Sequence, residues 1–516
     1  MTQVHGDPET CASLAQGTCR SQKCLIASLI SIAISSLIIF IIFTWTTFFP
    51  DAIISNLVVT EDSPMLEWWV RPPIRAVYKI RVFNYTNVEE FTRGEDVKLK
   101  VQEVGPYIYR ETLTRVNTVF YPNGTLSFQE KRSFQWEGGS PDDDVVVVPN
   151  IPLLTTMAFA RDMSIVTQLG LTVAISTFVP KIFVPLPVGG FLWGYDDKLF
   201  NAAKPLLSFL GEVPMEKFGV LAMKKGVSKD VLTMHTGEGD LSKMGMIERV
   251  NGREIRNMWG DDDCDKVHGS AGFLYPPEMY RNQSRSLDIY AADMCRTFKL
   301  DRAGEASSYG IPTISFKPPL DGFNFSPEKG HCFCPRKSKY RVNASDRTCP
   351  PKGIFNISAC ALDTPMVVSF PHFLGGESSL FANIEGLNPV ADLHQSHLEL
   401  HPRLGLLIGG HSRIQINVEA RKATGVPFLE NIKHGQILPI LWIEIGIDSM
   451  PETILSLLTH AYFTVGLVEA FFQWGSLLGV LFSTSGLLFL LQRNQKRHAV
   501  LKRNRSGQDK LLQESG

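Results

Sequence analysis

Apolar residues are distributed along the chain in three patterns, and the longest is a pair of charge-free runs near the two ends. The first run covers residues 25–49 (LIASLISIAISSLIIFIIFTWTTFF) and the second covers residues 470–491 (AFFQWGSLLGVLFSTSGLLFLL). At about 1.5 Å per helical residue, each run exceeds the ~30 Å hydrocarbon core of a bilayer. Both are therefore predicted to be transmembrane helices. The first is interpreted as a retained signal-anchor, because its apolar part is longer than that of a cleaved signal peptide.

Basic residues flank both runs on the side of the chain ends. Arg20 and Lys23 precede the first run, and six cations follow the second between Arg493 and Arg505. Lys and Arg beside a span favour the cytoplasm. Residues 1–24 and 492–516 are therefore predicted to be cytoplasmic tails, and residues 50–469 one extracellular or lumenal domain. The plasma membrane is the expected location, with an endosomal or lysosomal membrane left open.

The second pattern is the period-two alternation of half-buried β-strands. It appears in AVYKIRVFNYT from Ala76 and in KLKVQEV from Lys98, and GPYIYRETLTRVNTVFYPNGTLSFQE is typical of strand–turn–strand. The turn is Pro122-Asn123-Gly124, a hairpin signal. Strand-like alternation returns from about Phe218 and continues to Trp442. The domain between the spans is therefore predicted to be mainly β.

The third pattern is helical spacing in a charge-poor segment, residues 151–215. LLTTMAFARDMSIVTQLGL from Leu153 and FLWGYDDKLFNAAKPLLSFLG from Phe191 predict helices inserted in the β-rich chain. Two interpretations stay open for the insert: a subdomain that packs its own core, or an apolar surface offered to lipid-bearing particles. Its cations are Arg161, Lys181, Lys198 and Lys204.

Composition and sequons place the domain in a compartment. A net charge of −1 among 516 residues gives no indication of a nucleic-acid partner. The N-x-S/T triplet at Asn324 is discounted because proline follows it. Clustering of the remaining sequons between the spans indicates an oxidising, glycosylating compartment. The expected acceptors are Asn84, Asn123, Asn282, Asn343 and Asn356.

The cysteines divide between the first tail and residues 264–360. HCFCPRKSKYRVNASDRTCP (331–350) could by itself be a zinc site, a redox motif or part of a disulfide framework. The sequon at Asn343 within it favours disulfides, because that side of the membrane is oxidising. Cys332 and Cys334 are too close in sequence to bridge each other without strain, and six cysteines allow 15 pairings. Cys24 abuts the first run and is a candidate for S-palmitoylation, with a free thiol as the alternative.

Candidate chemical motifs are weak in this sequence. HQSHLELHP holds His394, His397 and His401, but its alternation favours a strand with structural histidines over a zinc face. The acidic runs at 141–144 and 261–264 lack the alternating ligands of a calcium loop. No GxSxG motif or Walker loop is present. We therefore expect no enzyme activity, metal or cofactor.

Nine short motifs, in a shared order, resemble the CD36 family, which includes class B scavenger receptors, sensory-neuron membrane proteins and a lysosomal member. They are EVGPYIYRE (103–111), FLWGYDD (191–197), NMWGDDDC (257–264), DMCR (293–296), CFC (332–334), SFPHFL (369–374), GLNP (386–389), HLELHP (397–402) and LPILW (438–442).

The resemblance implies a fold and a set of site residues. Family ectodomains are irregular antiparallel β-barrels with an internal hydrophobic tunnel and an apical α-helical bundle, here residues 151–215. Lys181 lies closest to the apical lysine position, and with Arg161 it is a candidate ligand-binding residue. In the disulfide region, 264–360, the family pattern implies the pairs Cys264–Cys332, Cys295–Cys360 and Cys334–Cys349.

The function implied is a receptor that binds lipid, lipoprotein or protein ligands at the apex and transfers lipid to the membrane through the tunnel. One alternative is a two-span ligand-gated channel, favoured by Glu469 at the edge of the second span. The other is a lysosomal cargo-sorting receptor, for which Leu511-Leu512 would be a dileucine signal. Homo-oligomerisation is left open.

Overall fold

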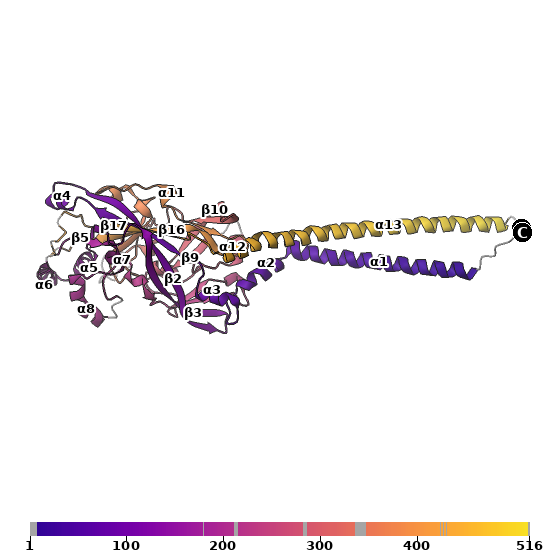
Figure 1. The fold of residues 1–516 in the computed structure, drawn as a ribbon, viewed down its shortest axis with the longest axis horizontal. Coiled ribbons are helices and arrows are strands. Elements are labelled where there is room, and N and C mark those ends of the chain that lie inside the picture. Colours follow the sequence, from indigo (N-terminus) through magenta and orange to yellow (C-terminus); the bar gives the residue numbers. More distant parts are fainter. Residues whose placement is uncertain are drawn as a thin grey trace. The chain divides into compact units, whose positions relative to one another are not determined.

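The structure is a computed structural model that describes residues 8–513 apart from 179, 211–214, 282–285, 336–346, 424, 427 and 430. The chain divides into two compact units (Figure 1). One comprises the residues up to Ile54 together with those from Thr459 onward, and the other is Ser55–Leu458.

The first unit is a pair of long helices, α1 (Pro8–Trp45) and α13 (Val465–Gln513), with the short α2 (Phe48–Ile54). The Gln473 side-chain amide donates to the Phe43 carbonyl oxygen at 2.6 Å. A Cβ on Gly479 would lie 2.5 Å from Ser36 Oγ, so glycine permits this close approach. Both predicted apolar runs are helical, and the two helices are long and apolar enough to cross a membrane. Each helix continues past its apolar run toward the chain end.

The second unit is built on one 15-stranded sheet, in which eleven of the strands follow the order β8-β7-β3-β2-β1-β17-β16-β15-β11-β10-β9. The predicted strand pairs near residues 76–139 are confirmed as β1, β2 and β3, and α4 (Val88–Arg93) between β1 and β2 was not predicted. The pairs along this order are antiparallel. The bounds are β1 (Val77–Tyr85), β2 (Leu99–Tyr121), β3 (Thr125–Gly139), β7 (Leu232–His235), β8 (Ile247–Val250), β9 (Leu287–Ala291), β10 (Arg296–Ser308), β11 (Ile311–Lys317), β15 (His397–Leu400), β16 (Leu407–Ala420) and β17 (Gln436–Gly446).

A short connection brings the two ends of this sheet together. β8 and β9 are the first and last strands in the order, and the segment Gly269-Ser270 hydrogen-bonds to both. Ile247 N donates to Gly269 O at 2.8 Å, and Ser270 N donates to Asp288 O at 2.8 Å. The sheet is therefore a nearly closed, barrel-like structure, as the resemblance implies.

The central strands β1 and β17 differ in how far their two faces are buried. In β1, Tyr78, Ile80 and Val82 are buried in the main hydrophobic core, whereas Lys79 and Arg81 point to the other face. β17 pairs with both β1 and β16, and nine consecutive residues of β17 are buried. This central position explains its nearly continuous apolar sequence.

The predicted helical insert consists of α5 (Ile151–Ala160), α6 (Ile165–Ser176), α7 (Val188–Trp193) and α8 (Lys198–Leu210), which gather at one end of the β-rich unit (Figure 1). A ribbon of β4 (Val145–Pro149) and β5 (Phe183–Pro187) accompanies them, and β5 was not predicted. The apolar pattern from Leu153 is broken before α6 because Ser164 caps that helix, its Oγ accepting from Thr167 N at 3.2 Å.

Candidate functional site

Helix α6 exposes apolar side chains and carries no charged residue. Ile165, Leu169 and Val173 follow one another at four-residue spacing and form a stripe along one face. Val173 is 69% exposed, and Val166 beside the stripe is 77% exposed. We call the exposed apolar residues of this region the α6 surface; they are Phe159, Met163, Ile165, Val166, Leu169, Val173 and Phe178.

Polar anchors hold the less exposed face of α6. The buried Gln168 accepts from Gly425 N at 2.8 Å through Oε1 and donates to Met163 O at 3.0 Å through Nε2. Thr172 Oγ1 donates to Gly425 O at 2.7 Å. Ile175 adds an apolar contact with the core. The helix is thus attached partly by hydrogen bonds, while much of its apolar surface faces solvent, the arrangement expected of an interaction surface.

The two predicted ligand-binding cations lie in this helical segment. Arg161 follows α5, and its carbonyl oxygen accepts from Gln168 Nε2 at 3.4 Å. Lys181 precedes β5, and its carbonyl oxygen accepts from Asn150 Nδ2 at 3.0 Å. Both side chains are exposed. Their backbones thus help to hold the segment, and their charged groups remain available to a ligand.

Three disulfides organise the loop-rich region: Cys264–Cys332, Cys295–Cys360 and Cys334–Cys349. These are the pairs that the family resemblance implies. The Arg347 guanidinium joins them to the neighbouring loop, because it donates to the carbonyl oxygens of Cys332, Cys334 and Trp259 at 2.5, 3.0 and 2.6 Å. The bridges are embedded in a cluster of aromatic side chains that includes Trp259, Phe323, Phe333 and Phe355.

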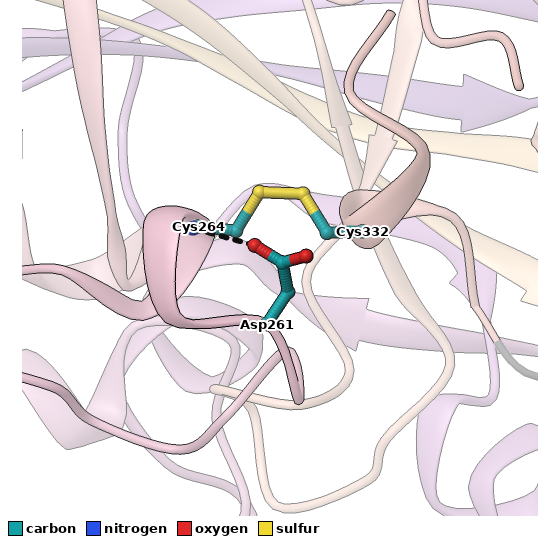
Figure 2. A group of neighbouring side chains, drawn as sticks. All are labelled: Asp261, Cys264 and Cys332. Carbon is teal, nitrogen blue, oxygen red and sulfur yellow. Dashed lines mark hydrogen bonds between the residues drawn. A yellow bond between two sulfur atoms is a disulfide. The ribbon is translucent and has the colours of Figure 1, made fainter. Parts of the chain in front are cut away.

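Asp261, Cys264 and Cys332 superficially resemble a metal site (Figure 2). The two sulfurs form a disulfide with each other, so neither is a thiolate that could bind an ion. Asp261 Oδ1 instead accepts from the backbone N–H groups of Asp263 and Cys264, and so caps α9 (Asp262–Asp265). This acidic run therefore serves local structure.

Asp265 has a structural role in the same loop. Its Oδ1 accepts from Met258 N and Trp259 N, at 2.6 and 2.9 Å. Its Oδ2 accepts from Gly260 N and Asp261 N, at 2.9 and 3.3 Å. One buried carboxylate thus satisfies four backbone donors.

Four of the motifs meet around one partly buried carboxylate, that of Glu103. Glu103 Oε2 accepts from Trp442 Nε1 at 2.9 Å and lies 2.5 Å from His372 Nε2. His372 Nδ1 accepts from Asn388 N at 3.1 Å. Although burial opposes it, hydrogen bonding by His372 and Trp442 lowers the pKa of Glu103. The ring of His394 stacks on that of His372, and burial lowers the pKa of His394 to about 4.

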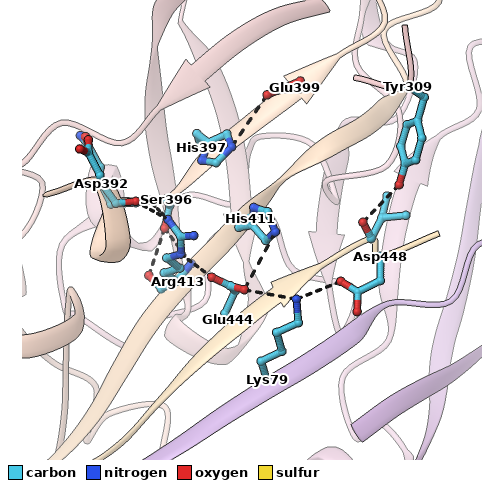
Figure 3. Close-up of polar contacts among 12 residues, drawn as sticks. Lys79, Tyr309, Asp392, Ser396, His397, Glu399, His411, Arg413, Glu444 and Asp448 are labelled. Carbon is cyan, nitrogen blue, oxygen red and sulfur yellow. Dashed lines mark hydrogen bonds and ion pairs between the residues drawn. The ribbon is translucent and has the colours of Figure 1, made fainter. Parts of the chain in front are cut away.

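A second polar cluster spans β1, β15, β16 and β17 (Figure 3). His397 and His411 face each other across β15 and β16, with ring centroids 5.5 Å apart. Burial, and then the neighbouring imidazole of His411, lower the pKa of His397. Burial also lowers the pKa of His411, although the carboxylate of Glu444 opposes this shift. Glu399 accepts from the hydroxyls of Ser308 and Thr313, at 2.6 and 3.0 Å. The predicted strand at HLEL is confirmed, and His394 precedes it in α11 (Ala391–His394).

Glu444 has cationic partners in this cluster. Its Oε2 accepts from Arg413 Nε at 2.7 Å, and its Oε1 lies 3.7 Å from Lys79 Nζ. Sequence patterns alone did not indicate Glu103, Glu399, Arg413 or Glu444 as members of a polar cluster. The available signal was an ionisable residue inside a mostly apolar strand, as in LPILWIEIG.

The expected modification sites differ in access. Asn123 is exposed in the β2–β3 turn, and Asn84 is partly buried with its Oδ1 accepting from Val147 N. Asn356 is only 4% exposed, and its Oδ1 accepts from Ser358 N. Asn282 and Asn343 lie outside the described residues. Cys24 is an exposed free cysteine at the start of the apolar run.

Comparison with known proteins assigns the fold to a family. The model of the CD36 family matches residues 27–491 of this chain. The chain belongs to the CD36 family. It is 29% identical to Scavenger receptor class B member 1 of Bos taurus over 400 residues, which are 76% of this chain and 74% of that protein. It is 27% identical to Lysosome membrane protein 2 of Mus musculus over 407 residues, which are 77% of this chain and 80% of that protein.

Membership of the CD36 family agrees with the membrane helices, the barrel-like sheet and the disulfides, and it favours a receptor over a ligand-gated channel. As a CD36-family member, the chain is a class B scavenger receptor-like membrane protein.

The polar clusters at Glu103 and Glu444 join strands far apart in sequence. We therefore assign several of the motifs to holding the sheet together, and the α6 surface is the candidate binding site.

Proposed function

We propose that the protein binds a lipid, lipoprotein or apolar protein ligand at the α6 surface and transfers lipid cargo to the membrane through a hydrophobic tunnel in its barrel. The observation that carries the proposal is the outward-facing, charge-free stripe of α6. Several exposed valine, leucine and isoleucine side chains on one helix represent an unfavourable hydration free energy that a ligand would remove.

A hydrophobic tunnel would lower the free-energy cost of moving lipid from the binding surface to the membrane. Moving a long-chain lipid through water costs about 0.8 kcal/mol for each exposed CH₂ group. An apolar path to the bilayer avoids that cost and needs no covalent chemistry. We therefore propose a transport receptor without enzymatic activity, with residues 50–469 outside the cytoplasm and both tails inside it.

The relatives support two locations. One is named a scavenger receptor and the other a lysosome membrane protein. We propose the plasma membrane as the main location and the endolysosomal membrane as the second. Arg161 and Lys181 would contribute to recognition where the ligand carries negative charge. Both side chains are exposed, and the two residues lie on either side of α6 in the sequence.

The test uses the full chain in nanodiscs and phosphatidylcholine–cholesterol emulsion particles as the probe. Val166→Asp and Val173→Asp place a charge on the α6 surface and should weaken particle binding at least about tenfold. Val119→Asp is the matched control, because Val119 is 50% exposed on β2. Equal binding by all three variants would overturn the proposal.

A further inference from the structure

Arg296, the first residue of β10, places its guanidinium among four phenylalanine rings. Its Cζ lies 4.4 Å from the ring centroids of both Phe298 and Phe333, 4.9 Å from that of Phe355 and 5.3 Å from that of Phe325. We call these five residues the Arg296 cage. Phe325 and Phe355 are buried, whereas Phe298, Phe333 and Arg296 itself are partly exposed, so the cage is not fully closed to solvent.

The positive charge of Arg296 has no carboxylate partner among the residues that the structure describes. Its Nε and Nη1 are enclosed without hydrogen-bond partners. Burial lowers the pKa of Arg296 to about 10, so the side chain remains charged at neutral pH. The ring faces offset part of the desolvation cost through cation–π attraction. They cannot supply the hydrogen-bond acceptors that a guanidinium ordinarily has.

Arg115 shows what a purely structural arrangement of this kind looks like. Its Cζ lies 4.8 Å from the Trp69 ring centroid and 5.7 Å from that of Phe128. Arg115 is only 6% exposed, and its Nη1 donates to the carbonyl oxygen of Trp69. That guanidinium is closed to solvent and ties α3 (Pro64–Val70) to β2. Arg296 differs in being partly open and in having no backbone acceptor among the described residues.

We propose that the Arg296 cage binds the carboxylate end of a fatty acid or a similar single-chain amphiphile. Nη2, the guanidinium nitrogen that is not enclosed, donates to a carboxylate oxygen, and the partly exposed rings of Phe298 and Phe333 contact the first methylenes. Guanidinium is weakly hydrated and suits carboxylates. One cation with one open nitrogen matches a monoanion better than a dianionic phosphate. This inference rests on the proposed lipid-handling function, for which it names a second binding site and a ligand class.

The experiment is photolabelling of the full chain in nanodiscs with palmitic acid that carries a diazirine in its acyl chain. The matched probe is the corresponding sixteen-carbon alcohol with the same diazirine, and labelled peptides are mapped by mass spectrometry. The acid should label the peptides containing Phe298 and Phe333 saturably, and the alcohol about tenfold less at the same concentration.

Three variants then separate charge from structure. Arg296→Gln should reduce labelling by the acid to the level of the alcohol, and Arg296→Lys should retain part of the preference. Lys299→Gln removes an exposed cation from the same strand and should leave the preference unchanged. Peptide mapping of the three disulfides reports whether each variant folds.

The outcomes distinguish this inference from the proposed function. Equal labelling of the cage peptides by the acid and the alcohol in the unmodified protein overturns the inference. This comparison does not require a variant. Labelling confined to the α6 surface also overturns it, but leaves the proposed function standing. An absence of saturable labelling anywhere on the protein would overturn both.

Discussion

The imidazole of His401 joins the turn after β15 to α12 (Glu452–Thr459), because its Nε2 lies 3.1 Å from the carbonyl oxygen of Leu458 and donates to it. On the other side of the ring, Nδ1 accepts from the backbone N–H groups of Arg403 and Leu404, both at 3.2 Å. These partners assign the neutral tautomer with its proton on Nε2. His401 is completely buried, and burial lowers its pKa to about 4.

Replacing His401 should destabilise the β-rich unit. His401→Leu fills the buried site with an apolar side chain but leaves the backbone groups of Arg403, Leu404 and Leu458 without this partner, so we expect a loss of about 2–4 kcal/mol. Thermal unfolding of the purified protein measures the effect. His268 is exposed, and His268→Leu should change stability by less than about 0.5 kcal/mol. Similar melting temperatures for the two variants would contradict the structural role of His401.

Acidification should weaken the fold between about pH 6.5 and pH 4. His394 and His401 have pKa values lowered to about 4 in the folded protein, whereas an unfolded histidine titrates near 6.5. Above pH 6.5 both states are neutral and stability is retained. As the pH falls, the unfolded chain binds protons that the folded chain excludes, so stability falls by up to about 1.4 kcal/mol per pH unit for each group.

Replacing His394 with a side chain that cannot titrate provides the control for this pH dependence. His394→Asn retains a side-chain acceptor for the backbone N–H of Val390, which now donates to His394 Nδ1 at 2.9 Å. The variant should lose the His394 contribution to the slope of unfolding free energy against pH. An unchanged slope would show that His394 does not resist protonation in the folded state.

The three disulfides predict a specific non-reducing peptide map. Cys332 and Cys334 should occur in different bridges, to Cys264 and to Cys349. The double variant Cys264→Ser/Cys332→Ser should lower stability by about 2–5 kcal/mol, because the bridge closes a loop with a sequence separation of 68. A peptide linking Cys332 directly to Cys334, or both recovered as free thiols, would refute the assignment.

The sequon asparagines that are exposed should carry glycans, and the buried ones should not. Asn123 lies in an exposed hairpin turn, so Asn123→Gln should remove one glycan from the mass of the mature protein. Asn356 is buried within β12 (Ile354–Asn356), a position that leaves little access for a glycan, and Asn356→Gln should leave the glycan mass unchanged. Intact-mass measurement before and after glycosidase treatment tests both. A glycan found on Asn356 would show that this strand is opened in the glycosylated protein.

Local sequence patterns were sufficient to predict those elements whose structure depends mainly on one local property. A charge-free run of bilayer length leaves few alternatives to a spanning helix, and period-two alternation correctly located β1, β2 and β3. The Pro122-Asn123-Gly124 turn was also predictable, since Gly124 adopts the left-handed conformation at φ +71° that glycine tolerates. The nine short motifs by themselves indicated the family.

Long-range partners could not be read from the same patterns. Glu103 and Trp442 are 339 residues apart in sequence, and only the β1–β2 and β1–β17 registers bring them together. In the same way, β-strand pairing places Glu444 beside Arg413 and Lys79.

The sequence by itself determined the membrane spans, the mainly β domain and the apolar helical insert, and it indicated that the cysteines of residues 264–360 form disulfides. The tertiary structure decided which side of that insert faces solvent. Because apolar residues occur around much of α6, helical periodicity could not choose the buried face. The choice depends on hydrogen bonds between Gly425 and the side chains of Gln168 and Thr172, more than 250 residues away, which turn the Ile165–Leu169–Val173 stripe outward.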